Sequence, residues 1–393
     1  MSKIPRLIQS PHEISDIASR LKNADIIGVD TEFIRETTFF PKIALLQLAT
    51  EEESWLLDPT TLGVAELAPI LEVFRDPNIL KVMHAAYADQ ECLYWAYGIV
   101  AEPVLDTAVA AALVGYGDSV GLGKLLKEVL RISLPKGRAR VKWLQRPLPQ
   151  ELLQYAEQDV AHLVRLTRAL LEKLSRKERA TWAIDESRVN PAVFEVSPED
   201  MARRLSKSGQ MDGVSFNVLT ELLRWREDRA RSANMPRGWV ADNEILVALA
   251  KVQPSTIEQL RSFRGLNLKE IEKSGTKILQ AVKTGKAAPI DTSLSFSRPI
   301  PQEREGHLQE FIRTYLSFLA DQHEIALRFL INTGRAAALA ENYDASVESW
   351  VEQGILSQNA SRLIGEELKA LLSGQRALVL RQGKVEILCL DSN

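Results

Sequence analysis

The stretch DIIGVDTEFIRETTFFPKIALLQLAT, residues 25–50, contains the pattern that decides the fold. Residues 25–33 are apolar and then turn acidic, which indicates a strand that ends in polar side chains. Residues 42–50 alternate and are rich in Leu and Ile, and a third short run, ESWLLDP (53–59), ends in a turn signal. Three strands in close succession, joined by short polar connections, predict an antiparallel meander.

Strand and helix patterns alternate after this meander. The expected elements are helix 64–75, strand 78–86, helix 87–97, a strand at Val104–Leu105, and helices 107–114, 121–130 and 150–174. Strands that come first and are followed by strand–helix alternation predict an α/β domain with a mixed sheet.

Two linker-like stretches, 191–198 and 292–301, divide the rest of the chain. The segment between them indicates helices with breaks at Pro236 and Pro254, and the last part indicates helices over 306–372. The C-terminal stretch 377–390 indicates a β-hairpin that turns at Gln382-Gly383. We therefore predict three domains: an α/β domain (1–202) and two small all-α domains (203–290 and 291–393), the last one carrying the hairpin.

The composition is that of an ordinary globular protein, with 393 residues, 45% hydrophobic and 26% charged. Collagen-like, disordered and disulfide-scaffold classes are therefore disfavoured. The two cysteines, Cys92 and Cys389, share no metal-ligand spacing, which favours a reducing, cytoplasmic setting. No apolar run approaches the ~18 residues of a membrane span, and the start lacks the apolar core of a signal peptide. We expect no membrane partner.

The net charge of −3 conceals a strong asymmetry along the chain. Residues 1–202 carry 23 Lys and Arg against 29 Asp and Glu, and residues 291–393 carry 10 against 14. Residues 203–290 carry 16 against 9, a balance of +7. A basic middle domain between two acidic ones makes the middle domain a candidate surface for nucleic acid.

Acidic side chains occur at three places in the predicted elements. Asp30 and Glu32 lie on one face of the first strand; taken alone, such a pair is more often a strand end that reaches solvent. Asp89 lies at a helix start, where simple capping is the alternative interpretation. Tyr155 and Asp159 are four residues apart on a helix and hence share a face. Together, four carboxylates suit two hard cations such as Mg²⁺ or Mn²⁺.

These residues carry a resemblance to a known family. GVDTEFIRETTFFPKIALLQLAT (28–50), KVMHAAYADQECL (81–93) and WLQRPLPQELLQYAEQDVAHL (143–163) resemble the three motifs of ribonuclease D, of the DEDD superfamily of 3′–5′ exonucleases, tyrosine subtype. Residues 219–266 are similar to the helical HRDC module, and 306–372 to a divergent second copy. In one departure, Lys142 precedes Trp143 where an acidic residue is expected.

The resemblance implies an RNase H-like mixed sheet followed by two HRDC-like domains, and it implies an activity. The enzyme would trim the 3′ ends of structured RNA, such as tRNA precursors, and release nucleoside 5′-monophosphates. Asp30, Glu32, Asp89 and Asp159 would hold two divalent metal ions, and Tyr155 would orient the attacking water and help to deprotonate it. We expect a monomer.

Further residues are candidates for binding the substrate. Thr31 and Phe33 flank the acidic pair, and Phe33 could either stack on a base or pack in the core. For His84 we favour a hydrogen bond to a buried neighbour over one to substrate. The basic stretch 131–146 contains no acidic residue, and it supplies Arg138, Arg140 and Lys142. The alternative interpretation of this stretch is a solvated charged face.

Two other functions stay open from the sequence. One is a DNA-directed 3′–5′ exonuclease of the same superfamily, since no feature of the sequence distinguishes RNA from DNA. The other is a non-catalytic nucleic-acid-binding protein. A helicase is disfavoured because the sequence contains no GxxxxGK[ST] phosphate loop.

Overall fold

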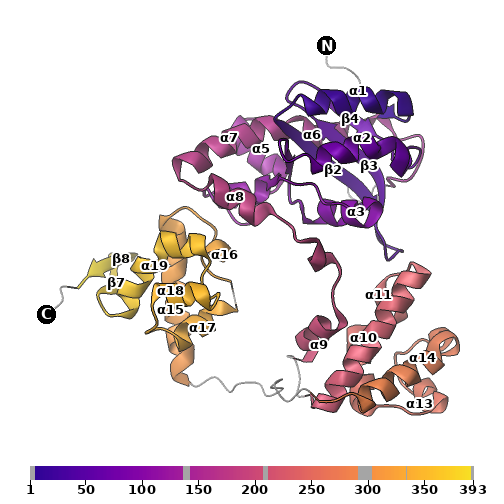
Figure 1. Ribbon diagram of the computed structural model, residues 1–393. Coiled ribbons are helices and arrows are strands. Elements are labelled where there is room, and N and C mark those ends of the chain that lie inside the picture. Colours follow the sequence, from indigo (N-terminus) through magenta and orange to yellow (C-terminus); the bar gives the residue numbers. More distant parts are fainter. Residues whose placement is uncertain (1–4, 136–141, 207–210, 291–302, 333, 391–393) are drawn as a thin grey trace.

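A six-stranded mixed sheet organises the N-terminal region (Figure 1). The computed structural model describes residues 5–135, 142–206, 211–290, 303–332 and 334–390. The strand order is β1-β4-β3-β2-β5-β6, with bounds Leu7–Ile8 (β1), Ile26–Ile34 (β2), Lys42–Ala49 (β3), Ser54–Leu57 (β4), Leu80–Met83 (β5) and Val104–Asp106 (β6). β2, β3 and β4 form the predicted antiparallel meander, while β5 and β6 are parallel to β2 and to each other. The predicted mixed sheet is confirmed.

Helices cover both faces of this sheet, as Figure 1 shows. On one face, α1 (Pro11–Lys22), α2 (Val64–Arg75) and α3 (Tyr87–Tyr97) pack their apolar stripes against Ile27 and Val29 of β2. On the other face lie α6 (Gln150–Ala161) and α7 (Leu163–Arg176). Because both faces are covered, β2 is a central strand, and its apolar half is fully buried.

Gly28 on β2 fixes how closely the α6–α7 junction approaches the sheet. A Cβ atom at this position would lie 3.2 Å from the Val160 carbonyl oxygen and 3.3 Å from the Leu163 Cβ. The absence of a side chain therefore lets the end of α6 rest on the strand. This contact brings Asp159, one residue before Val160, over the acidic end of β2.

Two predicted elements differ from those in the structure. The single helix expected at 150–174 is broken at His162, so that α6 lies over β3 and β4 while α7 crosses β2 and β5. The strand expected at 78–86 ends at Met83. It ends there because the backbone N–H groups of Ala85 and Ala86 donate to the Asp106 carboxylate, at 2.8 and 2.9 Å, instead of continuing the ladder.

The middle region is a helical domain with its own core. Its helices are α9 (Pro198–Ser206), α10 (Gly213–Ala233), α11 (Arg237–Val240), α12 (Asn243–Val252), α13 (Ile257–Arg261) and α14 (Leu268–Ala287). Gly285 lets α14 cross α10 closely, since a Cβ there would lie 2.5 Å from the Val218 Cα. The predicted domain boundary at 202/203 falls within α9, which packs on α10.

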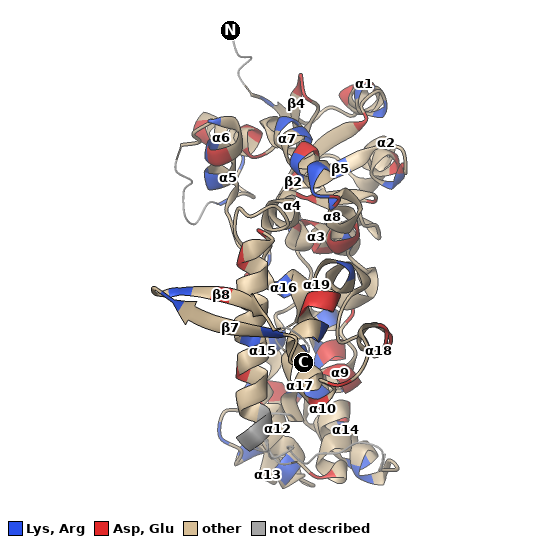
Figure 2. Ribbon diagram, turned by 90° about the vertical axis from the view of Figure 1, so that its left-hand side faces the viewer, with Lys and Arg blue, Asp and Glu red and all other residues tan. Residues whose placement is uncertain are grey.

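The C-terminal region shares one hydrophobic core with the N-terminal region. Its elements are α15 (Glu303–Gln322), α16 (Leu327–Leu330), α17 (Arg335–Glu341), α18 (Val347–Glu352), α19 (Gln358–Leu372) and the predicted hairpin β7–β8 (Arg376–Arg381 and Lys384–Cys389). The shared core joins these helices to α4 (Thr107–Ala112), α5 (Leu122–Leu130), α7 and α8 (Ala180–Ser187). The buried Arg179 guanidinium donates to the carbonyls of Leu113 and His323 and so links the two regions. Figure 2 shows the hairpin projecting from this unit, with basic residues at its tip.

Among the described residues, the helices include none that is both long and apolar enough to cross a membrane.

A buried ion pair anchors the segment that leads into α6. The Asp58 side chain is fully buried and accepts two hydrogen bonds from Arg146, at 2.6 and 2.8 Å, with further bonds from Gln9 and Thr60. Arg146 also donates to the carbonyls of Ala44 and Trp143, both at 2.7 Å. Burial alone would raise the pKa of Asp58, but the hydrogen bonds from Arg146, Thr60 and Gln9 outweigh it and lower the pKa to about 2.

We expect Arg146→Ala to destabilise the protein by about 3–5 kcal/mol, because it leaves the Asp58 carboxylate buried without its partner. Urea unfolding followed by circular dichroism would measure this loss. The matched control is Arg176→Ala, which removes an exposed pair with Glu172 and should cost less than about 0.5 kcal/mol. Equal effects of the two substitutions would show that the buried pair does not anchor the segment.

The same pair predicts an acid-dependent loss of stability. The folded pKa of Asp58 lies below the usual value of about 4 for a free Asp, so the unfolded state binds more protons as the pH falls. The wild type should have a higher free energy of unfolding than Asp58→Asn. This difference should be fully present above about pH 4 and should shrink as the pH falls toward 2. Urea midpoints of both proteins at pH 7, 5, 4 and 3 test this; a difference independent of pH would contradict it.

Candidate active site

Two carboxylates project from β2 at the point where the strand leaves the core. Asp30 pairs with Gln47 in the sheet register, and the Gln47 amide donates to its carboxylate at 3.0 Å. The register shifts between Glu32 and Phe33. This irregularity interrupts the pairing with β3 beside Glu32, and the pairing resumes with Phe33 opposite Ile43.

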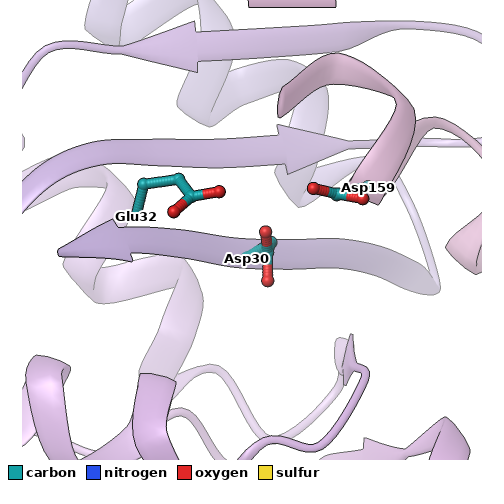
Figure 3. Close-up of side chains that lie close together, drawn as sticks. All are labelled: Asp30, Glu32 and Asp159. Carbon is teal, nitrogen blue, oxygen red and sulfur yellow. The ribbon is translucent and has the colours of Figure 1, made fainter. Parts of the chain in front are cut away.

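Asp159 completes a cluster of three carboxylates from two elements. One oxygen from each of Asp30, Glu32 and Asp159 lies within 4.8 Å of the others. Figure 3 shows Glu32 and Asp159 facing each other, with Asp30 on the strand between them. Oxygen atoms at this spacing can coordinate a divalent cation.

Asp89 adjoins this cluster from the first turn of α3. It is buried, and its carboxylate accepts hydrogen bonds from the Thr31 hydroxyl and from the Thr31 backbone N–H at 3.1 Å. Its charge acts on both Asp30 and Glu32. Thr31, a predicted substrate contact, thus bonds Asp89 through its side chain.

Burial raises the pKa of every carboxyl in this group, and the charges of the other members add to this for Asp30 and Glu32. The pKa of Glu32 rises to about 8, through burial and then the charges of Asp159 and Asp89. Burial raises the pKa of Asp89 and of Asp159 to about 6 in each case, and it raises that of Asp30 well above its usual value. In the part of the chain that the structure describes, no Lys or Arg forms an ion pair with these four residues. The donor set therefore fits divalent cations, which would supply the missing positive charge.

Tyr155 lies beside the cluster on the same face of α6 as Asp159. Its hydroxyl lies close enough to the Asp159 carboxylate to lower the pKa of that carboxyl, and its ring packs against that of Trp143, with centroids 6.3 Å apart. Burial, followed by the charges of Asp159 and Glu32, raises the pKa of Tyr155 above its ordinary value. The phenol therefore keeps its proton at neutral pH and can donate a hydrogen bond.

The other predicted substrate contacts lie in different surroundings. His84 Nδ1 is 2.8 Å from the Thr107 hydroxyl, and burial lowers its pKa, which favours the neutral ring. Phe33 is half-buried: it packs on the N-terminal core and also lines a pocket. Lys142 is exposed and lines the same pocket, whereas Arg138 and Arg140 lie outside the described residues. Arg146, from the same basic stretch, is bound to Asp58.

This pocket, termed the junction pocket, has a volume of about 960 Å³. Three segments line it: the end of β2 with the loop that follows, residues 142–145, and Pro236 with Arg237 from the middle region. It therefore lies between the N-terminal and middle regions, next to the residues that flank the carboxylate cluster.

In the middle region, the basic side chains between residues 224 and 237 mostly form ion pairs or hydrogen bonds within the protein. Its five arginines between 224 and 237 all have intramolecular partners: Arg224 with Glu199, Arg226 with Asn243, Arg229 with Glu270, and Arg231 and Arg237 with Glu227. Its two tryptophans differ, because Trp225 is buried while Trp239 is 58% exposed.

Sequence reasoning missed three residues that shape the site: Gly28, Gln47 and Trp143. A polar residue within the apolar run KIALLQLA could have drawn attention to Gln47, which is fully buried and bonds Asp30. The roles of Gly28 and Trp143 depend on contacts with α6 and had no local signal.

Comparison with known proteins shows which family the chain resembles. A family model described as 3′–5′ exonuclease matches residues 5–175, and the HRDC domain model matches residues 215–282. Ribonuclease D of Nitrobacter hamburgensis is 31% identical over 383 residues, covering 96% of this chain and 98% of that protein. Ribonuclease D of Gluconacetobacter diazotrophicus is 29% identical over 385 residues, covering 95% of this chain and 94% of that protein.

The fold is shared with a solved structure. Escherichia coli RNase D, an exoribonuclease involved in structured RNA processing, matches with a TM-score of 0.79 and 24% identity, covering 94% of this chain and 99% of that one. The mixed sheet and the mostly helical C-terminal part are common to both. Since a relative 31% identical to it spans nearly its whole length, the chain belongs to the ribonuclease D family and is a 3′–5′ exoribonuclease.

Proposed function

We propose that this exoribonuclease trims the 3′ ends of structured RNAs, such as tRNA precursors, and uses two divalent metal ions, Mg²⁺ or Mn²⁺. The observation that carries the metal proposal is the group of buried and half-buried carboxylates with no basic partner among the described residues. The relationship to E. coli RNase D, which is involved in structured RNA processing, supports the class of substrate.

In this proposal, Asp30, Glu32, Asp89 and Asp159 hold the ions. Divalent ions in such sites lower the pKa of coordinated water and stabilise the charge of a leaving oxygen. Gln47 restrains Asp30, and Thr31 restrains Asp89, so both carboxylates keep their orientation as substrate binds and leaves. The products are nucleoside 5′-monophosphates.

Tyr155 orients the attacking water in this scheme. Its ring is held by Trp143 and its hydroxyl lies beside Asp159, so the phenolic oxygen occupies a fixed position at the edge of the cluster. A protonated phenol positions the water by hydrogen bonding. The predicted assistance in deprotonation would require the phenolate, which burial and the nearby carboxylates disfavour.

The metal proposal predicts a stability effect that is independent of catalysis. In EDTA, Asp30→Asn should be more stable than the wild type, because it removes one charge from the repelling cluster. Saturating Mn²⁺ should raise the thermal midpoint of the wild type, by an amount equivalent to about 2.7 kcal/mol at 100-fold excess over Kd, and should raise that of Asp30→Asn much less. Asp185→Asn, at an exposed position, is the control and should behave as wild type. Equal stabilisation of all three proteins by Mn²⁺ would contradict the site.

The raised pKa values also predict how the stability difference between Asp30→Asn and the wild type changes with pH. A carboxyl whose folded pKa lies above its unfolded value destabilises the fold as the pH rises between the two. The advantage of Asp30→Asn in EDTA should thus grow from pH 5 to pH 8, the range that includes the pKa of about 8 for Glu32.

The catalytic proposal predicts graded losses of activity. With Mg²⁺ or Mn²⁺ and a 3′-extended tRNA, Asp30→Asn should lose about 10³-fold or more in kcat, and Tyr155→Phe about 10–10²-fold. Release of 5′-mononucleotides is the measurement, and matched RNA and DNA oligomers serve as parallel substrates. Full activity of Asp30→Asn would overturn the site assignment, and faster digestion of DNA than of RNA would favour the DNA-directed alternative.

A further inference from the structure

We propose that the β7–β8 hairpin, termed the arm, binds the double-helical stem of a structured RNA while the 3′ end of the same molecule occupies the carboxylate cluster. This inference rests on the proposed function, because it takes structured RNA as the substrate. It assigns a partner to an element that contributes no residue to the cluster.

The arm is basic in a region that is otherwise acidic. Residues 291–393 hold 10 Lys and Arg, of which three lie on the arm (Arg376, Arg381 and Lys384), and 14 Asp and Glu, of which one does (Glu386). The arm therefore has a charge balance of +2, whereas the rest of this region has −6. An acidic surface repels RNA, so the arm is the part of this region best suited to approach a phosphate backbone.

The turn of the hairpin brings two cations together at its tip. Gln382 and Gly383 form a two-residue turn with φ of 50° and 77°, and two positive φ values are typical of turns that match the twist of a hairpin. Arg381 pairs with Lys384 across this turn, so their side chains share one face of the ribbon. Figure 2 shows both strands coloured as basic at this end.

Both cations are available to an external anion. The Arg381 guanidinium lies 4.0 Å from the Glu386 carboxylate, but these side chains are 62% and 50% exposed, and such a pair contributes little in water. Lys384 is exposed and forms no ion pair within the part of the chain that the structure describes. Arg376, at the base of the arm, differs because it pairs with Glu367 at 2.7 Å.

The base of the arm is packed, whereas its outer half extends beyond the core. Leu378 and Ile387 pack against the core that the C-terminal region shares with the N-terminal region. Leu380 and Val385, the next pair on the same face, are 73% and 43% exposed. Packing therefore accounts for the base but not for the extension, since a two-stranded ribbon in water gains little stability of its own.

The arm keeps a fixed position relative to the carboxylate cluster. The C-terminal helices share one core with α7, and the Arg179 guanidinium bonds carbonyls on both sides of the junction. In Figure 2 the arm projects to the same side of the molecule as α6, the helix that carries Tyr155 and Asp159. An RNA whose 3′ end lies at the cluster can therefore present its body to the arm.

A double-helical stem fits the arm better than a single strand does. Residues 376–389 contain no aromatic side chain, and single-strand binding depends on aromatic rings for base stacking. A-form stems are bound instead through phosphates and 2′-hydroxyls across a wide, shallow minor groove, largely without regard to sequence. A narrow ribbon can lay Leu380 and Val385 against the riboses of this groove, while Arg381 and Lys384 reach phosphates. A second copy of this chain, packed on the apolar pair, would leave the two cations unused.

The test compares two RNAs of equal length that share one single-stranded 3′ tail, the first with a duplex stem before the tail and the second unpaired throughout. The full-length wild type is measured with Mg²⁺ beside the double variant Arg381→Ala, Lys384→Ala. The variant should lose about tenfold in kcat/KM on the stem RNA, mainly in KM, and less than about twofold on the unpaired RNA. Each duplex phosphate contact adds about 0.9 to the slope of log affinity against log salt, so this slope should fall by about 1.8 for the stem RNA.

Two further variants separate the charge of the tip from other effects. The exchange Arg381→Lys, Lys384→Arg keeps both charges and should match the wild type on both RNAs. The double variant Lys124→Ala, Arg176→Ala removes two cations from exposed pairs within α5 and α7. It changes the net charge by the same amount as the alanine variant of the tip and should also match the wild type.

The remaining outcomes would overturn the inference. Equal losses on both RNAs would mean that the arm does not bind the stem, and no loss on either would mean that it binds no RNA. A wild type that is dimeric by light scattering, and monomeric as Leu380→Asp, would mean that a second copy covers the arm. The proposed function would fail in a different way, if the wild type digested the unpaired RNA but did not trim the tail of the stem RNA.

Discussion

The crowding of four carboxylates, with Asp89 buried and the other three half-buried, is the constraint to which the rest of the exonuclease domain is fitted. Asp30, Glu32, Asp89 and Asp159 come from three elements; burial raises the pKa of each, and the charges of the others add to this for Asp30 and Glu32. Without a cation such a group opposes folding, so rigid packing around it has to hold the carboxylates together. The apolar half of β2, covered by helices on both faces, supplies that rigidity.

Three of the four carboxylates are positioned by contacts outside the cluster. The absence of a side chain at Gly28 lets the end of α6 settle on β2, which places Asp159. Gln47 holds Asp30, and Thr31 holds Asp89. The Asp58–Arg146 pair fixes the segment that precedes α6, and the same segment carries Trp143 to the ring of Tyr155. A buried ion pair that lies away from the cluster thereby helps to set the position of a proposed catalytic residue, because both depend on one short stretch of chain.

The sequence predicted the features that have a local signal. The meander, the alternation that follows it and the C-terminal hairpin all depend on periodicity and turn residues, and the structure confirms them. The break at His162 was missed because the apolar spacing continues across it, and the early end of β5 because it depends on Asp106, some twenty residues away. The four carboxylates and Tyr155 stood out through family motifs, but their assignment as a site stays a prediction. The net charge of the middle domain was a poor guide to how many of its basic side chains are free to bind nucleic acid, since the arginines from 224 to 237 are paired internally.

The two helical regions are attached to the exonuclease domain in different ways, and this difference bears on their roles. The C-terminal region shares a continuous apolar core with α4, α5, α7 and α8, so the two cannot separate without exposing that core to water. The HRDC domain has its own core and meets the exonuclease domain through the Phe39–Phe40 loop and the Asn234 side chain. A core-sharing attachment adds stability, whereas the smaller contact made by this loop and by Arg231 against Trp95 of α3 mainly sets orientation. Because that loop begins at the end of β2, the strand that carries Asp30 and Glu32 also sets the position of the HRDC domain. The carboxylate cluster and the wall of the junction pocket are therefore aligned by a single strand.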